Sequence, residues 1–357
     1  PFRLGYTFLR GREIFFCASA ENYEKFDPDT ISSPEEGRRT RFWANATGSD
    51  FCFRCLTGSA KSLVRDNKLL GTTLWNHPWL DSSTRDILLA FHGLLLTTGE
   101  YGTARHLLIQ MGDCLESGLL PRRLTNPKGT LEYQAIDLPL WFIHCAFEYL
   151  KYSEDYETVE HTLFPHLKSV IERWIQGTPF LRIGQDGLVS AAREGIPLTW
   201  MDGQAGAQAI TPRHGKPVEI QALWYNALCE MAFLADCFGE PAQKRSYEAW
   251  SQQAKRSFNQ LFWMEDSSGS CSRGYLYDVV SEKANDRNLR PNQLLALGLP
   301  FPILEEDRDK WRSIVMIARK HLVTPYGLRT LAPHESDYHA HCEGDPSRRI
   351  WAAVQGT

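Results

Sequence analysis

The sequence lacks a strong charge of one sign and long apolar runs. Its 357 residues carry 39 Lys and Arg against 43 Asp and Glu, a formal net charge of −4, so no basic field attracts nucleic acid or anionic lipid. No uncharged apolar run reaches the roughly 18 residues of a membrane-spanning helix, and no signal peptide opens the sequence. We therefore expect a cytoplasmic globular protein without nucleic-acid or membrane partners.

A metal-binding cysteine pattern is also lacking. The nine cysteines are scattered, and the closest approach to a pattern is Cys52 and Cys55, a single CxxC without a second pair or a downstream His cluster. The P-loop, GxSxG, HExxH and dinucleotide-binding Gly-rich motifs do not occur in a suitable setting. We expect no metal and no cofactor, and we interpret the cysteines as thiols in a reducing compartment.

The chain changes character near residue 45. Residues 1–45 mix aromatic and β-branched residues in short runs, followed by a polar stretch with Pro and Gly, which predicts the tail of a β-rich module and a linker. Residues 46–357 follow the helical period instead. For example, Leu167, Val170 and Trp174 occupy positions i, i+3 and i+7, which is typical of a helix with one buried face.

Other segments of the helical region are apolar on nearly every face. Residues 85–96, 137–150 and 218–235 are of this kind, and such helices are normally enclosed by neighbours. The alternation predicts two concentric rings of about nine or ten helices. The connections are long and rich in Gly, Pro, Trp and Asp, and because long loops in a compact domain are usually functional, we expect them to meet at one mouth of the rings.

Tryptophan recurs beside carboxylates and amides in and next to these connections. Trp200 lies two residues before Asp202, and Trp141 lies four residues after Asp137. Aromatic faces stack on the apolar faces of sugar rings, while carboxylates and amides bind hydroxyl groups, so the pattern indicates a carbohydrate site. The alternative is that these residues only pack in the core and cap helices.

Six blocks of the sequence stand out, residues 79–101, 133–142, 186–203, 211–228, 289–300 and 322–333. They resemble, in the same order, the amylo-α-1,6-glucosidase part of glycogen debranching enzymes. The resemblance covers about residues 50–357 and implies an all-α (α/α)6 barrel, in agreement with the two predicted rings. It further implies an inverting hydrolase that removes α-1,6-linked glucosyl stubs from glycogen or a limit dextrin.

The resemblance also assigns roles to single residues. Asp202 matches the general acid, and its neighbours Trp200 and Met201 are apolar, which favours the protonated form of a partly buried carboxyl group. Arg85, Asp86 and Asp137 are expected to bind the non-reducing glucose. The other residues expected to bind substrate are Trp141, Trp200, Glu219, Trp224, Asn292, Gln293, Tyr326, Arg329 and Gln355.

The sequence departs from the family pattern at three places. Ser83 and Thr84 replace a Trp-Gly pair, and Ala353 and Val354 replace an aromatic residue and a histidine. The sequence stops at Thr357, where the family continues into the segment that carries its general base.

We therefore expect a barrel that lacks its last helices and is completed by another segment or chain. Because inversion needs two carboxyl groups, Glu343 and Asp345 are the candidate substitutes for the base. Two alternatives remain open for the function. One is an inverting exo-α-glucosidase that acts on other gluco-oligosaccharides, and the other is a non-catalytic glucan-binding protein.

Overall fold

The computed structural model forms two compact units, residues 1–63 and 64–357. In the first unit, β1 (Arg3–Phe8) pairs antiparallel with β2 (Ile14–Ser19), in the region predicted to contain strands. The predicted boundary between residues 45 and 46 lies outside the described residues and stays a prediction. The structure describes residues 3–8, 14–19, 56, 58–60, 64–65, 73–74, 83–124, 131–191, 195–205, 208–265, 274–341 and 343–356.

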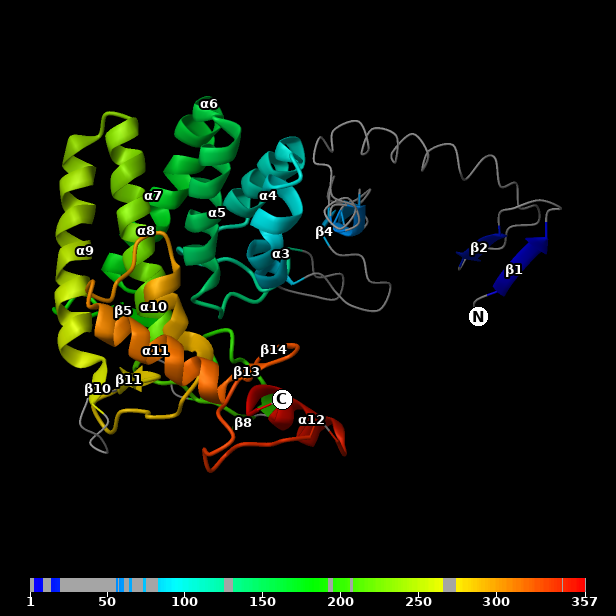
Figure 1. Ribbon diagram of the computed structural model, residues 1–357. Coiled ribbons are helices and arrows are strands. Elements are labelled where there is room, and N and C mark those ends of the chain that lie inside the picture. Colours follow the sequence, from blue (N-terminus) through cyan, green and yellow to red (C-terminus); the bar gives the residue numbers. More distant parts are fainter. Residues whose placement is uncertain are drawn as a thin grey trace. The chain divides into compact units, whose positions relative to one another are not determined.

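The second unit is mostly helical, and its described part contains about ten α-helices (Figure 1). Two π-helical segments, 92–96 and 159–163, extend α3 and join α6 to α7. The 3-10 helix Pro291–Leu294 leads directly into α10. The helices are α3 (Thr84–Phe91), α4 (Tyr101–Asp113), α5 (Leu138–Ser153), α6 (Tyr156–Thr158), α7 (Phe164–Gln176), α8 (Val218–Cys237), α9 (Pro241–Leu261), α10 (Leu295–Gly298), α11 (Arg308–His321) and α12 (Pro346–Val354).

Short antiparallel hairpins occupy several of the connections. None of the sheets in the described residues has more than two strands, so the strands shape the loops and do not form a layer of their own. The pairs are β3 (Val64–Arg65) with β4 (Thr73–Leu74), β5 (Leu181–Ile183) with β6 (Val189–Ala191), β7 (Gln204–Ala205) with β8 (Gln208–Ala209), β9 (Lys216–Pro217) with β12 (Val279–Val280), β10 (Trp263–Glu265) with β11 (Gly274–Leu276), and β13 (Val323–Thr324) with β14 (Gly327–Leu328).

The two kinds of helix predicted from hydrophobic periodicity are both present. Helices α5 and α8 are buried along most of their length and pack against each other, while α9 covers α8, and α3 and α4 cover α5. Helix α7 buries one stripe that includes Leu167, Val170 and Trp174. No helix among the described residues is both long and apolar enough to cross a membrane.

The N-terminal ends of α5 and α8 supply two carboxylates to the region described below. Asp137 directly precedes α5, which has Pro139 in its first turn, a position where the missing N–H of proline costs no helical hydrogen bond. Glu219 lies in the first turn of α8, after Pro217 in an extended conformation. Carboxylates are favoured at both positions because they face the positive end of a helix dipole.

Candidate active site

The segment between β6 and β7 carries Asp202, and three hydrogen bonds to its backbone carbonyl groups fix it. The amide of Ile136 donates to Leu198 O over 2.9 Å, and the amide of Ile210 donates to Gly203 O over 3.0 Å. The Thr211 hydroxyl donates to Met201 O over 2.9 Å. The position of Asp202 is therefore set by parts of the chain on both sides of it in sequence.

Arg85, in the first turn of α3, joins Asp202 to Asp137. Its Nε and Nη2 atoms donate to the two carboxylate oxygens of Asp137 over 2.7 and 3.0 Å, and its Nη1 donates to Asp202 Oδ2 over 2.8 Å. Burial lowers the pKa of Arg85, but the carboxylates of Asp137 and Asp202 more than offset this and raise it above its ordinary value. Arg85 is thus a permanent, largely buried cation.

A second guanidinium contacts the same oxygen of Asp202. Arg122, on the connection between α4 and α5, donates from Nη2 to Asp202 Oδ2. The nearest charged groups of Asp202 are thus two cations. The side chains of Trp200 and Met201, predicted to surround Asp202, contact Asn292. Trp200 Nε1 donates to Asn292 Oδ1 over 2.9 Å, and Met201 Sδ accepts from Asn292 Nδ2 at 3.5 Å.

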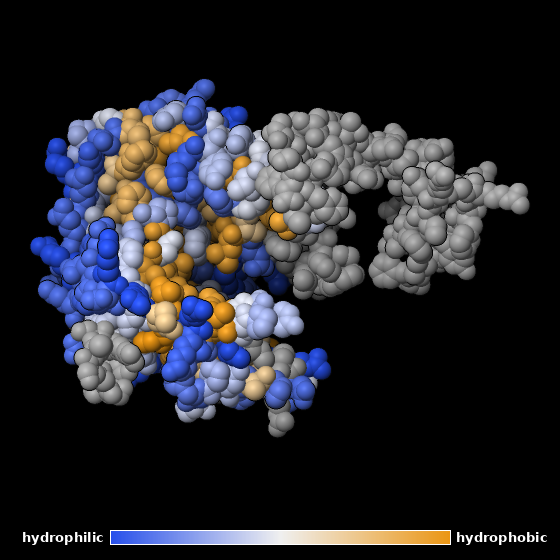
Figure 2. Space-filling model, viewed as in Figure 1, coloured by the Kyte–Doolittle hydropathy of each residue, from blue (hydrophilic) through white to orange (hydrophobic). Residues whose placement is uncertain are grey.

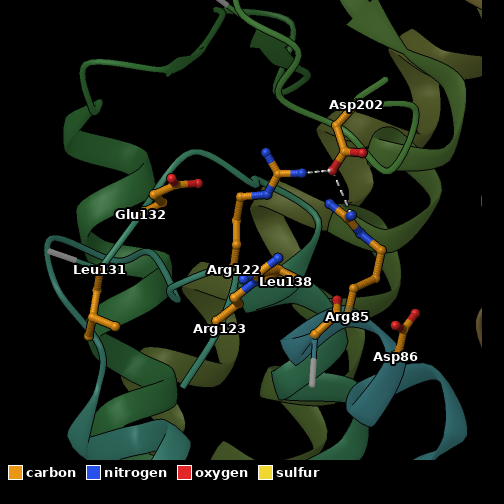
Figure 3. A pocket seen from close by; sticks show the side chains of 9 residues that line it. Arg85, Asp86, Arg122, Arg123, Leu131, Glu132, Leu138 and Asp202 are labelled. Atoms are coloured by element: carbon orange, nitrogen blue, oxygen red, sulfur yellow. Dashed lines mark hydrogen bonds and ion pairs between the residues drawn. The ribbon is translucent and has the colours of Figure 1, made fainter. Parts of the chain in front are cut away.

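Asp202 faces a cavity of about 520 Å³, within the range of small-ligand sites. Figure 3 shows Arg122, Leu131 and Glu132 on one side of Asp202, and Arg85 and Asp86 on the other. None of the described lining residues is aromatic, so the expected stacking of a sugar ring on tryptophan has no counterpart in this wall. The lining residues are Ser83, Arg85, Asp86, Arg122, Arg123, Leu131, Glu132, Leu138 and Asp202.

A buried ion cluster lies behind the Asp202 segment. Arg213 donates from Nε to Asp278 Oδ2 over 2.8 Å, from Nη2 to Glu219 Oε2 over 2.7 Å, and from Nη1 to Thr199 Oγ1 over 3.3 Å. Burial lowers the pKa of Arg213, but Asp278 and Glu219 raise it overall. Asn292 extends the cluster, since its Nδ2 donates to Asp278 Oδ1 over 2.8 Å.

Four of the residues expected to bind substrate belong to this buried region and do not line the cavity. Glu219 and Asn292 contact the cluster as described, and Gln293 Oε1 accepts from the Leu276 amide over 3.1 Å. Gln355 Oε1 accepts from Arg290 Nη2 over 2.7 Å. All four side chains are buried. Asn292, and Glu219 through Arg213, support the Asp202 segment, and contact of the four with substrate stays a prediction.

The remaining expected residues lie apart from the cavity. Trp224 is fully buried, stacks on Trp174 at a centroid distance of 5.6 Å and donates to Gly187 O over 3.1 Å. Tyr326 is 100% exposed. Arg329 is half-buried, and Trp141 is half-buried beside His144. Glu343 and Asp345, the candidate substitutes for the base, are exposed and do not line the cavity.

Two of the departures from the family pattern lie at the site. Ser83 lines the cavity wall. Val354, on α12, packs against Gly203, the residue after Asp202, so closely that a Cβ at Gly203 would lie 2.6 Å from Val354 Cγ2. The C-terminal helix therefore touches the segment that carries the candidate acid.

Sequence reasoning missed Arg122, Arg123 and Glu132. They belong to a connection between two helices that contains no tryptophan and no aspartate before Asp137, so the pattern of aromatic and acidic residues could not identify them. The only signal was the adjacent Arg122 and Arg123 in a long loop, and paired basic residues are common on protein surfaces.

A family model described as amylo-alpha-1,6-glucosidase matches residues 57–357, a range that contains all six sequence blocks. Glycogen debranching enzyme of Saccharomyces cerevisiae is 24% identical over 353 residues, covering 76% of this chain and 22% of the yeast protein. The chain thus spans about a fifth of that relative. A rhamnosidase from Klebsiella oxytoca with rhamnose bound has a TM-score of 0.45 and 19% identity, covering 65% of this chain and 43% of that one.

Proposed function

Because this chain belongs to the amylo-alpha-1,6-glucosidase family of glycoside hydrolases, we propose that it hydrolyses α-1,6-linked glucosyl stubs of a glycogen-like glucan with inversion at the anomeric carbon. We further propose that its helices form part of an (α/α)6 barrel. The observation that carries the proposal is the position of Asp202, which lies in a polar cavity and shares Arg85 with Asp137.

In the proposed reaction, Asp202 is the general acid. Its carboxyl proton passes to the glycosidic oxygen as the bond from that oxygen to the anomeric carbon breaks. A water molecule attacks the anomeric carbon from the opposite face and loses a proton to a second carboxylate, which gives the inverted sugar and a free hydroxyl on the glucan. No cofactor is needed for these steps.

The non-reducing glucosyl group is proposed to lie on the side of Arg85. The Arg85–Asp137 pair is rigid because it is bidentate and largely buried, and Asp86 lines the same side of the cavity. Carboxylate and guanidinium groups together can accept from and donate to the several hydroxyls of one sugar ring. This arrangement suits an exo-acting enzyme that removes a single sugar.

The second carboxylate is proposed to come from Glu343 or Asp345 after a movement of their loop, or from a segment outside this chain. Both residues are exposed and away from the cavity, so the first route requires a substrate-induced closure. Replacing both by the corresponding amides distinguishes the routes, because only the first predicts a loss of turnover.

Asp202→Asn tests the proposal, with Asp113→Asn, an exposed aspartate at the end of α4, as a matched control. We expect Asp202→Asn to lower glucose release from a branched oligosaccharide by about 10²- to 10⁴-fold, and the control to have wild-type activity. Proton NMR during the wild-type reaction should show β-glucose first.

Three other outcomes would contradict the proposal in different ways. Glucose released from maltose but not from a branch stub would favour the exo-α-glucosidase. Glucan binding without turnover in the wild type and the variant would favour a binding protein. α-Glucose as the first product would exclude inversion.

A further inference from the structure

The two guanidinium groups on Asp202 Oδ2 are held in very different ways. The Arg85 side chain is 13% exposed, its bidentate partner Asp137 is 2% exposed, and a fourth contact runs from Nη2 to Thr199 O over 3.4 Å. Arg85 cannot leave Asp202 without breaking a buried ion pair, and a buried charge that loses its partner is costly. Arg85 is therefore a fixed partner of Asp202.

Arg122 is anchored by its backbone and not by its side chain. Its amide donates to Glu132 O over 2.8 Å, and its carbonyl accepts from the amide of Thr84, at the start of α3, over 2.9 Å. The side chain is 32% exposed, and within the described part of the chain its hydrogen bond to Asp202 is the one that holds it. Arg122 is thus the partner that can move.

Oδ2 of Asp202 cannot carry the acid proton while both contacts persist, so the proton then has to be on Oδ1. Oδ2 accepts from two N–H groups, and a proton on this oxygen would point at groups that are themselves donors with no acceptor capacity. The proton reaches the glycosidic oxygen from Oδ1, or from Oδ2 once one guanidinium has withdrawn. Arg122 is the one that withdraws at the lower cost, because its side chain is partly in water.

We infer that Arg122 holds Asp202 in the resting site and, once released, binds hydroxyls of the leaving glucan chain. The inference rests on the proposed function, which places the non-reducing sugar on the side of Arg85. The scissile bond then lies at Asp202, and the leaving chain extends to the other side of it, where Arg122, Glu132 and Leu131 line the cavity (Figure 3). Arg122 is thus a determinant of leaving-group specificity.

The test compares two substrates that share the glucosyl group and differ in the leaving group. α-Glucosyl fluoride has no leaving sugar and needs little proton donation. A branched oligosaccharide with one α-1,6-glucosyl stub has a leaving sugar and needs a proton on its glycosidic oxygen. We expect Arg122→Gln to lower kcat/KM for the oligosaccharide by about 10- to 100-fold, the loss of a charged hydrogen bond, and to change kcat/KM for the fluoride by less than about threefold. Arg122→Lys, which keeps the charge but not the planar fork, should lie between.

Arg105→Gln is the matched control. Arg105 lies on α4 outside the cavity, and like Arg122 it pairs with an aspartate, Asp155. It should leave both kcat/KM values unchanged. Equal losses on the two substrates in Arg122→Gln and Arg122→Lys would mean that Arg122 only supports the fold, and no loss on either would mean that it does not touch substrate. Both results overturn the inference.

A binding measurement keeps the inference separate from the proposed function. If the wild type hydrolyses neither substrate, the proposed function fails. Calorimetry then compares a one-ring glucose analogue such as 1-deoxynojirimycin with the branched oligosaccharide. Arg122→Gln should weaken only the oligosaccharide, by about 10-fold. Equal weakening of both ligands, unchanged affinities, or no binding of either ligand to the wild type would overturn it.

Discussion

At the scale of single residues, Asp137 and Asp202 share Arg85 but do different work. Asp137 is buried and binds Arg85 through both oxygens, while Asp202 is 21% exposed and binds through one. Removing the charge of Asp137 leaves a buried cation with only its weaker partner. Removing the charge of Asp202 leaves the bidentate pair intact.

This difference predicts that the two variants both lose activity but differ in how much stability they lose. We expect Asp137→Asn to lower the free energy of unfolding by about 3 kcal/mol, the usual cost of breaking a buried ion pair, and to abolish activity as well. Asp202→Asn should lower it by less than about 1 kcal/mol while lowering activity by about 10²- to 10⁴-fold. Urea unfolding of both variants and of Asp113→Asn measures this, and equal losses for Asp137→Asn and Asp202→Asn would contradict the ranking.

The sequence pattern identified some residues of the site and not others, for physical reasons. Arg85, Asp86 and Asp202 belong to family motifs, and all three line the cavity. Arg122 could not be found, because a loop arginine becomes functional only through the fold that brings it to an aspartate 80 positions away in sequence.

The sequence pattern also could not show which of the aromatic residues are buried in the core. Trp224 is in a family motif but stacks on Trp174 in the core. An aromatic residue beside a carboxylate reads the same in sequence whether it faces a cavity or a helix.

At the scale of elements, α5 and α8 are joined by a buried polar contact away from the cavity. His144 Nδ1 lies 2.6 Å from Glu230 Oε1, which also accepts from Asn226 Nδ2 over 2.7 Å. Burial lowers the pKa of His144, but Glu230 and then Glu148 raise it overall above its ordinary value, against a smaller lowering effect of Lys151. Burial raises the pKa of Glu230.

Both shifts make the packing of α5 on α8 weaker as the pH rises. A raised pKa in the folded state means that His144 stabilises the fold fully below its ordinary pKa of about 6.5, and that this contribution disappears as the pH rises through the higher folded value. Burial also disfavours the ionised form of Glu230. Its contribution to stability is therefore lost as the pH rises as well, beginning at a lower pH than that of His144.

We therefore expect His144→Gln to cost roughly 2 kcal/mol at pH 6, the size of a charged hydrogen bond, and less at pH 9. The free energy of unfolding is measured by urea at several pH values. As a control, His161→Gln in the segment before α7 should follow the wild-type curve. A cost of His144→Gln that grows with pH would contradict the assignment.

Helix periodicity predicted most of the elements but not the details between them. The stripes of α7 and the all-round apolar character of α5 and α8 were legible because helix burial follows a fixed spacing. The two-stranded hairpins of the second unit were not predicted, since strands of two or three residues are too short for an alternation to be recognised. The buried cluster of Arg213, Glu219 and Asp278 was hidden because its members come from separate segments.

At the scale of the whole second unit, large apolar side chains remain exposed on helices that the sequence predicts to be enclosed. Leu89 on α3 is 53% exposed and Phe233 on α8 is 48% exposed, although both helices pack on α5. Apolar side chains also reach the surface over α8 and α10 (Figure 2). Contiguous exposed apolar surface favours association.

We expect these apolar side chains to be covered by another segment of the same protein or by a partner chain. In its absence the purified chain should self-associate with increasing concentration, and the double change Leu89→Glu and Phe233→Glu should reduce this. Light scattering measures the association, and Val315→Glu on α11, at an equally exposed apolar residue, serves as the control. A monodisperse wild-type monomer that unfolds in one cooperative transition would contradict the expectation.

The contact between Gly203 and Val354 makes the position of the candidate acid depend on residues that are synthesised much later than Asp202. Trp200 donates a hydrogen bond to Asn292, and Arg290, two residues before Asn292, donates one to Gln355. Together with Val354, these residues hold the Asp202 segment, although they follow it by up to about 150 positions in the sequence. During translation the earlier helices can pack while the acid is still unplaced. A chain that lacks α12 would then lack one support of the Asp202 segment, and we expect hydrolysis to begin only when α12 has docked on it.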